Sequence, residues 1–281
     1  LMRLTLADLL TMQTGLNSRD SYLYQWTGLF AMQKTADWPR YILNLPFDVE
    51  PGTRYDYSNM SSFLLSAIVA KATGMDTLSF AKTYLFEPLG INEVKWEQSP
   101  QGIYIGWARM WLKPHDMVKI GLLFLHNGRW EDEQIVSAKW VKESITAHSF
   151  PKQYRRVLNE NGKVDYKKTI GHWLFTKLAK PLSDGYGYQW WLDKRGIYAA
   201  VGVGGQYIMV VPQKKIVVAV TSKLSGADSF FPVKLLNKYI LPAVVSKDAI
   251  PPNEAAQREL ALLSQAKEEV VEKTATSTSS V

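Results

Sequence analysis

The sequence has no cysteine and only four histidines among its 281 residues. Without cysteine there is no disulfide, no thiolate nucleophile and no cysteine-ligated metal, although this absence leaves the cellular compartment open. The histidines do not follow the spacing of a metal site, and they are His115, His126, His148 and His172. We therefore expect no metal and no other cofactor.

Several other patterns are missing. There is no Gly-x-Ser-x-Gly elbow of an α/β-hydrolase and no Gly-x-Gly-x-x-Gly loop that opens a helix. No apolar run reaches the length of a membrane span, so we expect no transmembrane segment. The formal net charge is +7, but the densest basic clusters are only the pairs Arg155-Arg156 and Lys167-Lys168. This pattern is typical of a solvated surface, and we expect no nucleic-acid partner.

Helical periodicity dominates the first part of the chain. Hydrophobic residues make up 46% of the sequence, enough for a sizeable core in one large or two ordinary domains. Polar residues 149–185 predict a long excursion of loops, and the tail 274–281 predicts disorder. Spacing and capping residues predict helices over residues 4–15, 37–43, 60–74, 77–86, 113–127, 137–147, 227–241 and 253–271.

Alternation of period two begins near residue 186. It predicts four strands in a meander, over residues 186–192, 198–202, 206–211 and 215–222. Helices first and strands last indicate an α+β fold. We expect a mainly helical lobe over 1–170, an antiparallel sheet with a closing helix over 171–245, and a C-terminal helix with a disordered tail over 246–281.

The segment from Pro51 to Asn59 is the most informative part of the sequence. Pro51-Gly52 predicts a turn, Tyr55 and Tyr57 lie in a short extended piece, and Ser58 or Asn59 is placed to cap the following helix. Tyr57 and Asn59 would then lie together at the start of a buried helix. The pattern Tyr-x-Asn also occurs by chance. In that case the asparagine would simply cap the helix, and the tyrosine beside it would be half-buried.

The order of three segments carries a resemblance. Residues 4–16, the Pro51 to Asn59 segment and residues 86–91 (Phe-Glu-Pro-Leu-Gly-Ile) resemble serine hydrolases related to β-lactamases and penicillin-binding proteins. The class C-like branch, with family VIII esterases and 6-aminohexanoate-dimer hydrolase, is the most similar. The resemblance covers most of residues 4–240, with Asp8 in place of the usual histidine. It implies a β-lactamase/transpeptidase-like fold.

The resemblance also implies roles for two residues. Tyr57 would be the general base and the general acid to the leaving group, and Asn59 would hydrogen-bond a catalytic lysine and the carbonyl side of the substrate. A tyrosine titrates near 10, so Tyr57 needs a neighbouring ammonium to act at neutral pH. The family's Ser-x-x-Lys nucleophile would lie upstream of Leu1, together with strands that complete the sheet. The chain as given is then expected to be an inactive piece of a longer protein.

Three Ser-x-x-Lys matches occur within the chain, beginning at Ser79, Ser149 and Ser264. All three follow Tyr57, whereas the family's nucleophile precedes the Tyr-x-Asn motif. Ser79 lies where the family has a packing helix, and Ser149 precedes a proline in a predicted loop. Ser264 lies on the polar C-terminal helix. We do not expect any of them to be the nucleophile.

The family's third motif is a Lys-Thr-Gly, His-Thr-Gly or Trp-Gly-Gly triplet on a strand. Residues 200–202 (Ala-Val-Gly) match it here, and the backbone N–H of Val203 would then donate to the oxyanion. A slip of one or two residues would move this role to Gly205 or Gln206, and a glycine-rich β-bulge is the alternative interpretation. The expected substrate-binding backbone comprises Gly202, Gly204, Gly205 and Gln206.

Ala200 cannot bind a carboxylate as lysine or histidine does in that triplet. The sequence therefore favours a small-molecule ester or amide substrate over β-lactams and peptide termini. Trp107, Trp190 and Trp191 would line an apolar acyl pocket, or belong to the core. The alternatives are a non-catalytic binding module of the same fold, a β-lactamase or D-Ala-D-Ala carboxypeptidase, and a remnant that cannot fold alone.

Overall fold

The computed structural model describes residues 4–20, 26–151, 182–246, 251–259 and 261–262. The chain divides into two compact units, Leu1–Leu241 and Pro242–Val281. In the second unit, residues 254–259 and 261–262 are helical, inside the helix predicted over 253–271. Of the loops predicted over 149–185, residues 152–181 lie outside the described residues, as does the tail predicted over 274–281.

The first helix, α1 (Leu6–Leu10), is shorter than predicted. Thr5 caps it: the Thr5 hydroxyl accepts from the Asp8 N–H at 3.2 Å, and the Asp8 carboxylate accepts from the Thr5 N–H at 2.8 Å. Gly15 is not its stop. A Cβ at Gly15 would lie 2.3 Å from the Val49 carbonyl oxygen, and φ is +70°. Glycine is required there by a close backbone approach, not by the end of the helix.

Three further helices build the core of the helical part: α2 (Thr27–Gln33), α3 (Trp38–Leu43) and α4 (Asn59–Thr73). The Asp37 carboxylate caps α3, and α4 ends at Gly74, the predicted end, in the left-handed region with φ 71°. Apolar residues of these helices and of α1, together with Leu16 and Ile105 from outside the helices, form one buried cluster: Leu9, Leu16, Leu29, Met32, Trp38, Ile42, Met60, Phe63, Leu64 and Ile105.

The middle of the chain follows the predicted order. The helix expected over 77–86 is α5 (Thr77–Ala81) continued by a π-helical turn (Lys82–Phe86). Ser137 caps α7 (Ala138–Ser144) by accepting from the Trp140 N–H at 3.2 Å. The other elements here are the antiparallel pairs β1 (Lys95–Trp96) with β2 (Met110–Trp111) and β3 (Arg129–Trp130) with β4 (Glu133–Gln134), and the helices α6 (Pro114–Leu125) and α7 (Ala138–Ser144).

The main sheet has five antiparallel strands in sequential order: β5 (Gly185–Tyr186), β6 (Trp191–Leu192), β7 (Tyr198–Gly202), β8 (Gln206–Val211) and β9 (Ile216–Val220). The last three match the prediction. The single strand predicted over 186–192 is wrong, because the chain turns between β5 and β6. Gln189 has φ 65° in this turn, where its backbone N–H donates to the Leu10 carbonyl oxygen at 3.2 Å.

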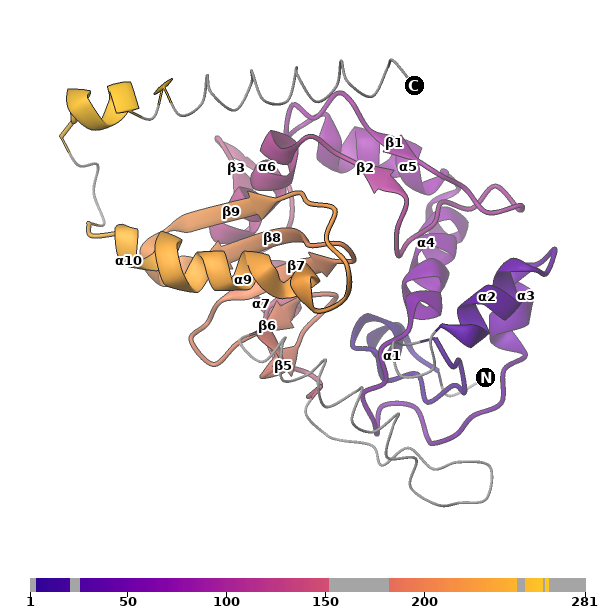
Figure 1. The fold of residues 1–281 in the computed structure, drawn as a ribbon. Coiled ribbons are helices and arrows are strands. Elements are labelled where there is room, and N and C mark those ends of the chain that lie inside the picture. The colour runs from indigo at the N-terminus through magenta and orange to yellow at the C-terminus, as the bar shows by residue number, and fades with distance from the viewer. Residues whose placement is uncertain (1–3, 21–25, 152–181, 247–250, 260, 263–281) are drawn as a thin grey trace, which may run out of the picture. The chain divides into compact units, whose positions relative to one another are not determined.

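Both faces of this sheet are covered by helices (Figure 1). One face, with Ala199, Tyr207 and Met209, packs against α9 (Phe231–Leu235) and the π-helical turn Leu236–Ile240. The opposite face, with Tyr198 and Val210, packs against residues of α6. A 3-10 turn (Gly226–Phe230) comes before α9. The helix α10 (Leu241–Ala243) comes after the π-helical turn. The closing helix predicted over 227–241 is therefore divided into several shorter helical pieces.

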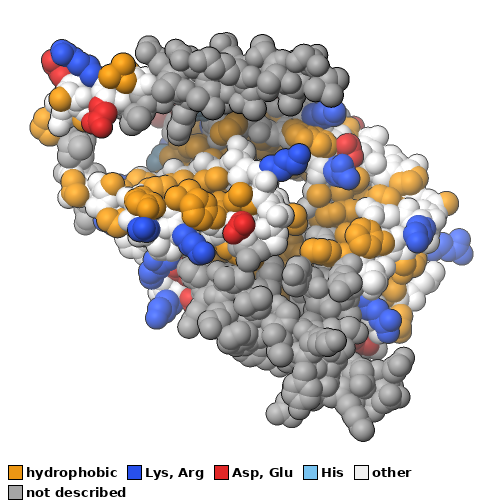
Figure 2. Space-filling view, in the orientation of Figure 1, with side chains coloured by type: hydrophobic (Ala, Val, Ile, Leu, Met, Phe, Trp, Pro, Cys, Tyr) orange, Lys and Arg blue, Asp and Glu red, His pale blue; other side chains and the backbone are white. Residues whose placement is uncertain are grey.

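Not all apolar side chains are covered. Phe231 and Tyr239 are 47% and 57% exposed, and apolar side chains gather over α9 (Figure 2).

Among the described residues, no single helix is long and apolar enough to cross a membrane. The pair Asn59–Thr73 and Thr77–Phe86 reaches that length only together and is bent by 80°.

Candidate active site

The segment before α4 is fixed by contacts to the end of α1. The Gly52 N–H donates to the Gln13 carbonyl oxygen and the Asp56 N–H to the Met12 carbonyl oxygen, both at 2.8 Å. Arg54 lies between two carboxylates, with its Nη2 3.7 Å from Asp56 and 3.9 Å from Asp48. These contacts hold the backbone extended as it enters α4, so Tyr57 and Asn59 have fixed positions.

Asn59 is the first residue of α4, and its side chain is held by a buried aspartate. The Asn59 Nδ2 donates to Asp20 Oδ1 at 2.8 Å, and the Met60 N–H donates to Asp20 Oδ2 at 2.8 Å. Ser58 occupies the cap position, but its hydroxyl does not cap the helix and donates to Asp20 Oδ2 at 3.1 Å. The predicted N-cap position of Ser58 is therefore confirmed, but the Asp20 carboxylate and not the Ser58 side chain accepts from the free Met60 N–H of the first turn.

Asp20 is only 1% exposed. Burial raises the pKa of its carboxyl to about 6, against the opposing effect of its hydrogen bonds from Asn59, Met60 and Ser58. Among the described residues, Asp20 forms no ion pair. The sequence offered no signal for this residue, because it lies in an irregular segment 39 residues before Asn59.

Tyr57 stacks on Trp191 of β6, with ring centroids 5.9 Å apart and an interplanar angle of 26°. Trp191 also contacts Tyr186 and Tyr55 edge to face, at 5.1 and 6.3 Å. Burial, and secondly the charge of Asp20, raise the pKa of Tyr57 to about 12. In this environment Tyr57 stays protonated at neutral pH, since no cation among the described residues lowers its pKa.

The predicted third motif lies on β7 and in the following hairpin. Gly202 pairs with Gln206, and residues 203–205 form the connecting loop. Gly204 and Gly205 adopt φ of 80° and 86°, and Val203 is 86% exposed. The glycines therefore lie in a hairpin turn, where a positive φ favours glycine.

Ser222 shapes this loop, and sequence reasoning missed it. Its hydroxyl donates to the carbonyl oxygens of Gly204 and Gly205, at 2.7 and 2.9 Å. In a trans peptide the carbonyl and the next N–H point in opposite directions, so the N–H groups of Gly205 and Gln206 point away from Ser222. Gly205 and Gln206 are the residues that would donate to the oxyanion if the third motif were shifted by one or two residues. The Val203 N–H donates no hydrogen bond within the described part of the chain.

The two motifs meet through Trp191. Trp191 pairs with Ala199 of β7, one residue before the predicted triplet. Tyr57 thus contacts the strand next to β7, and the loop from Val203 to Gly205 lies at the other end of β7. The structure brings Tyr57 and Asn59 together with Asp20 and Trp191, and the sheet connects this group to the glycine loop.

The tryptophans take different places. Trp107 packs against Trp38 and Phe63 at centroid distances of 5.8 and 5.7 Å, beside the buried cluster of the helical part. Trp190 is buried against Phe124 at 4.6 Å, on the α6 side of the sheet. Trp191 is the tryptophan in contact with Tyr57.

Two of the Ser-x-x-Lys serines have structural roles. The Ser79 hydroxyl donates to the Asp76 carboxylate at 2.6 Å in the first turn of α5. Ser149 is 2% exposed, and its hydroxyl donates to the Thr11 carbonyl oxygen at 2.7 Å. Ser264 lies outside the described residues. The contacts of Ser79 and Ser149 explain both hydroxyls without a nucleophilic role.

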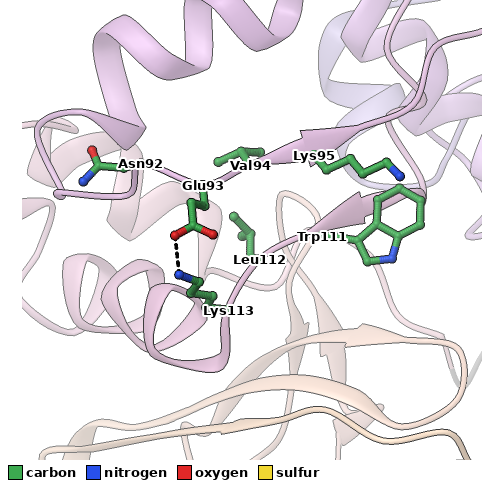
Figure 3. Close-up of a pocket in the computed structure, with 7 residues that line it drawn as sticks. All are labelled: Asn92, Glu93, Val94, Lys95, Trp111, Leu112 and Lys113. Carbon is green, nitrogen blue, oxygen red and sulfur yellow. Dashed lines mark hydrogen bonds and ion pairs between the residues drawn. The ribbon is translucent and has the colours of Figure 1, made fainter.

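Two surface pockets lie apart from these residues. A cavity of about 450 Å³ is lined by residues 92–95 and 111–113, where Glu93 pairs with Lys113 and the Lys95 ammonium lies 5.2 Å from the Trp111 ring centroid (Figure 3). Another, of about 480 Å³, is lined by residues of β5, β6 and β7 and the turns around them. Neither includes a predicted site residue. Among the described residues, no group of three His, Asp or Glu side chains could hold a metal.

A sequence model of the family named Beta-lactamase matches residues 2–238. The chain belongs to the β-lactamase family. This confirms the resemblance noted from Tyr57, Asn59 and the segments around them. No protein with a curated description matches the sequence.

Solved structures agree with this β-lactamase-family fold. They include a proposed 6-aminohexanoate-dimer hydrolase from Bacillus anthracis (18% identity, TM-score 0.62, 86% of this chain and 63% of that one) and a proposed β-lactamase from Bacteroides dorei (17%, 0.62, 86% and 73%). The LovD9 mutant of simvastatin synthase from Aspergillus terreus is also similar (16%, 0.59, 85% and 68%). The predicted β-lactamase/transpeptidase-like α+β fold is confirmed. The chain spans less than two thirds of the Bacillus anthracis protein.

Proposed function

We propose that this β-lactamase-family protein is a serine hydrolase that cleaves small esters or amides through an acyl-enzyme, with Tyr57 and Asn59 in its active site. The observation that carries the proposal is the fixed pair at the start of α4: Tyr57 stacks on Trp191, and Asn59 is bonded to Asp20. The family assignment gives this pair its chemical meaning, since a fixed tyrosine alone is common in protein cores.

The nucleophile in this proposal is the serine of a Ser-x-x-Lys motif that precedes residue 1 of this sequence. The structural contacts of Ser79 and Ser149 support this, because both hydroxyls already donate to acceptors within the fold. The lysine would bring an ammonium next to Tyr57, and a positive neighbour lowers a tyrosine pKa from the value of about 12 that burial imposes. On this proposal, the 281 residues alone do not turn over substrate.

The reaction would proceed in two steps. Tyr57 takes the proton of the serine hydroxyl, the serine oxygen bonds to the substrate carbonyl carbon, and the oxyanion accepts a hydrogen bond from the Val203 backbone N–H. As the carbon–leaving-group bond breaks, Tyr57 returns the proton to the leaving alcohol or amine. Water then attacks the acyl-enzyme by the same route, which releases the acid and the free serine.

The substrate class follows from the β7 triplet. Ala200 lacks the cation that would bind the carboxylate of a β-lactam or a peptide terminus, so neutral esters and small amides are favoured. The backbone of Gly202 at the end of β7, of Gly204 and Gly205 in the following loop and of Gln206 at the start of β8 would lie beside the substrate. Trp107 stays a proposed part of the acyl pocket, although it packs beside core residues Trp38 and Phe63.

The proposal is tested on the protein extended upstream to include its Ser-x-x-Lys motif. Short p-nitrophenyl esters and a chromogenic cephalosporin are assayed in parallel. We expect ester cleavage that depends on the upstream serine, and Tyr57→Phe should lower kcat by at least about 100-fold because the proton carrier is lost.

Tyr55→Phe is the matched control. Tyr55 lies two residues away in the same extended segment, and its buried hydroxyl has no hydrogen-bond partner among the described residues. Ester turnover should survive this change. Turnover that also survives Tyr57→Phe would contradict the assigned roles, and rapid cephalosporin cleavage would contradict the interpretation of Ala200. No turnover and no upstream motif would favour a non-catalytic binding module.

A further inference from the structure

The Asp20 carboxylate is surrounded by donors from the start of α4. Asn59 Nδ2, the Ser58 hydroxyl and the Met60 N–H reach it at 2.8, 3.1 and 2.8 Å. The backbone of its own segment is also held, since the Gly28 N–H donates to the Arg19 carbonyl oxygen at 3.1 Å. A carboxylate this buried is retained against a desolvation cost, so its contacts deserve a specific explanation.

The contacts fix which way the Asn59 amide faces. An ionised carboxylate only accepts hydrogen bonds, so Asn59 must turn its NH₂ group, and not its oxygen, toward Asp20. One N–H of the Asn59 amide then donates to Asp20, and its second N–H and its oxygen Oδ1 remain available for other partners. Within the described part of the chain, Asn59 Oδ1 accepts no hydrogen bond. The amide therefore presents an acceptor on its other side.

We propose that Asp20 is a positioning residue for the active site: its carboxylate orients the Asn59 amide so that Oδ1 is presented as an acceptor to a cationic or hydroxyl donor of the catalytic group. The inference rests on the proposed function for its catalytic meaning, but the orientation itself stands on the hydrogen bonds alone. Asp20 acts through Asn59 and contacts no substrate.

The variant Asp20→Asn reverses the orientation without removing the hydrogen bonds. The new amide oxygen takes the place of Oδ2 and accepts from Ser58 and Met60, and the new NH₂ group faces Asn59. Two NH₂ groups cannot bond, so Asn59 turns over and presents its oxygen to position 20. The fold is kept, while the group offered to the active site changes from an acceptor to a donor.

The orientation is measured in the 281-residue chain, without any activity, by following the Asn59 side-chain NH₂ resonances in ¹⁵N-labelled protein. We expect both proton signals to shift between about pH 5 and about pH 7 as Asp20 ionises, and this titration to disappear in Asp20→Asn. Among the described residues, Tyr57 is a titratable group affected by the charge of Asp20, and it stays protonated across this range. Asn59 NH₂ resonances that change neither with pH nor in Asp20→Asn would overturn the proposal.

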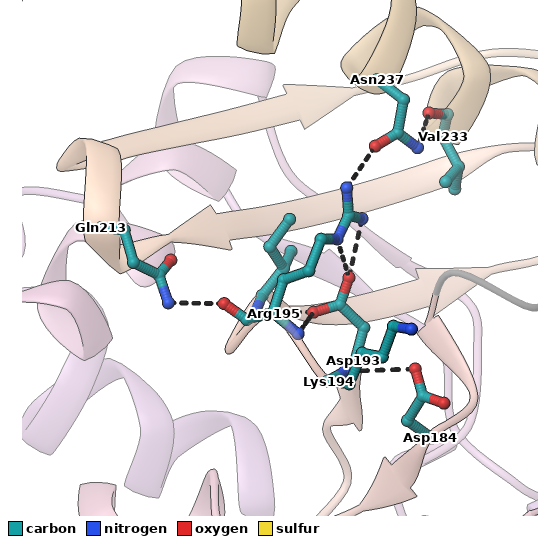
Figure 4. A network of polar contacts seen from close by, with 8 residues as sticks. Asp184, Asp193, Lys194, Arg195, Gln213, Val233 and Asn237 are labelled. Carbon is teal, nitrogen blue, oxygen red and sulfur yellow. Dashed lines mark hydrogen bonds and ion pairs between the residues drawn. The ribbon is translucent and has the colours of Figure 1, made fainter.

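Asp193→Asn is the matched control. Asp193 is also buried, at 8% exposure, and accepts from the Arg195 N–H, the Arg195 Nε and the Ile197 N–H at 2.8, 2.7 and 3.0 Å (Figure 4). It lies in the turn between β6 and β7 and has no contact with Asn59. Its substitution tests the loss of a buried hydrogen-bonded carboxylate as such, and the Asn59 signals should not move.

The catalytic consequence is measured in the upstream-extended protein once it cleaves esters. Asp20→Asn should lower kcat by about 100-fold with little change in KM, because the substrate still binds but a reacting group is misplaced. The exchanged pair Asp20→Asn with Asn59→Asp restores an acceptor at position 59 and keeps the net charge, so it should recover at least about tenfold of the loss.

The two arms separate the possible failures. If the Asn59 signals respond but no ester is cleaved, the proposed function fails and the orientation stands. If esters are cleaved but Asp20→Asn affects kcat no more than Asp193→Asn does, the positioning role fails. A loss that the exchanged pair does not rescue shows a purely structural role for Asp20 and also overturns the inference.

Discussion

Single residues in this protein are constrained by contacts that their neighbours in sequence do not reveal. Gly205 is an example. Its φ is +86°, and a Cβ there would lie 2.3 Å from the Ser222 hydroxyl oxygen. That hydroxyl donates to the carbonyl oxygens of Gly204 and Gly205, so a side chain at Gly205 would displace the contact that shapes the loop.

Gly205→Ala should therefore destabilise the fold by more than the left-handed backbone alone explains. Gly102→Ala is the matched control, because Gly102 has φ +75° and open space around its Cβ position. Both variants bear a conformational cost of about 1–2 kcal/mol, and Gly205→Ala should lose about 1 kcal/mol more with the Ser222 bonds. Urea unfolding measures both. Equal losses would show that Ser222 does not constrain the loop.

At the scale of elements, α4 depends on a cap from outside its own segment. The Met60 N–H donates to a carboxylate 40 residues earlier in the chain. A negative charge near a helix N-terminus is favourable, yet burial of the Asp20 carboxyl still raises its pKa from 3.8 to about 6. The N-terminus of α4 therefore couples its stability to pH.

The sign of this coupling is unusual for a carboxyl group. Because the folded pKa of Asp20 lies above the unfolded value, the folded state binds more protons between these two values. The stabilising contribution is complete near the unfolded pKa and is lost as the pH rises through about 6. The unfolding free energy of the natural protein minus that of Asp20→Asn should fall by about 2 kcal/mol from about pH 4.5 to about pH 7.

Denaturant titrations of both proteins across this range test the prediction, and the other carboxyl groups cancel in the difference. A difference that is constant, or that grows with pH, would contradict the raised pKa of Asp20.

At the scale of the first compact unit, Gln189 joins the sheet to the helical part. Its side-chain Nε2 donates to the Leu10 carbonyl oxygen at 3.0 Å, and its Oε1 accepts from the Ser62 hydroxyl of α4 at 2.7 Å. Gln189 also forms the turn between β5 and β6. This turn leads directly into Trp191 of β6, whose ring contacts Tyr57. One turn thus connects the sheet, α1 and α4.

Gln189→Ala should lower the unfolding free energy by about 1–3 kcal/mol, since it removes two side-chain hydrogen bonds and leaves partly buried partners unpaired. Gln213→Ala is the control, because Gln213 also donates to a backbone carbonyl, that of Arg195, but within the sheet region. Thermal unfolding followed by circular dichroism compares the two. A loss no larger than that of Gln213→Ala would show that the contacts to Leu10 and Ser62 contribute little.

The sequence by itself determined the elements whose causes are local. The Thr5 capping box, the Asp37 cap of α3, the glycine stop of α4 and the alternation of β7, β8 and β9 all arise from residues a few positions apart. It also indicated the β-lactamase family, because the order of its segments does not depend on distant contacts.

The tertiary structure alone decided the contacts between residues distant in sequence. The turn at Gln189, which splits the predicted strand 186–192, is held by partners 127 and 179 residues away, and Asp20 reaches Met60 across 40 residues. Single-sequence patterns record propensity and period, and neither contains the partner of a hydrogen bond made after the chain has folded back. For this reason the sequence predicts Tyr57 and Asn59 as site residues, whereas the hydrogen bond from Asn59 to Asp20 and the stacking of Tyr57 on Trp191 are seen only in the folded chain.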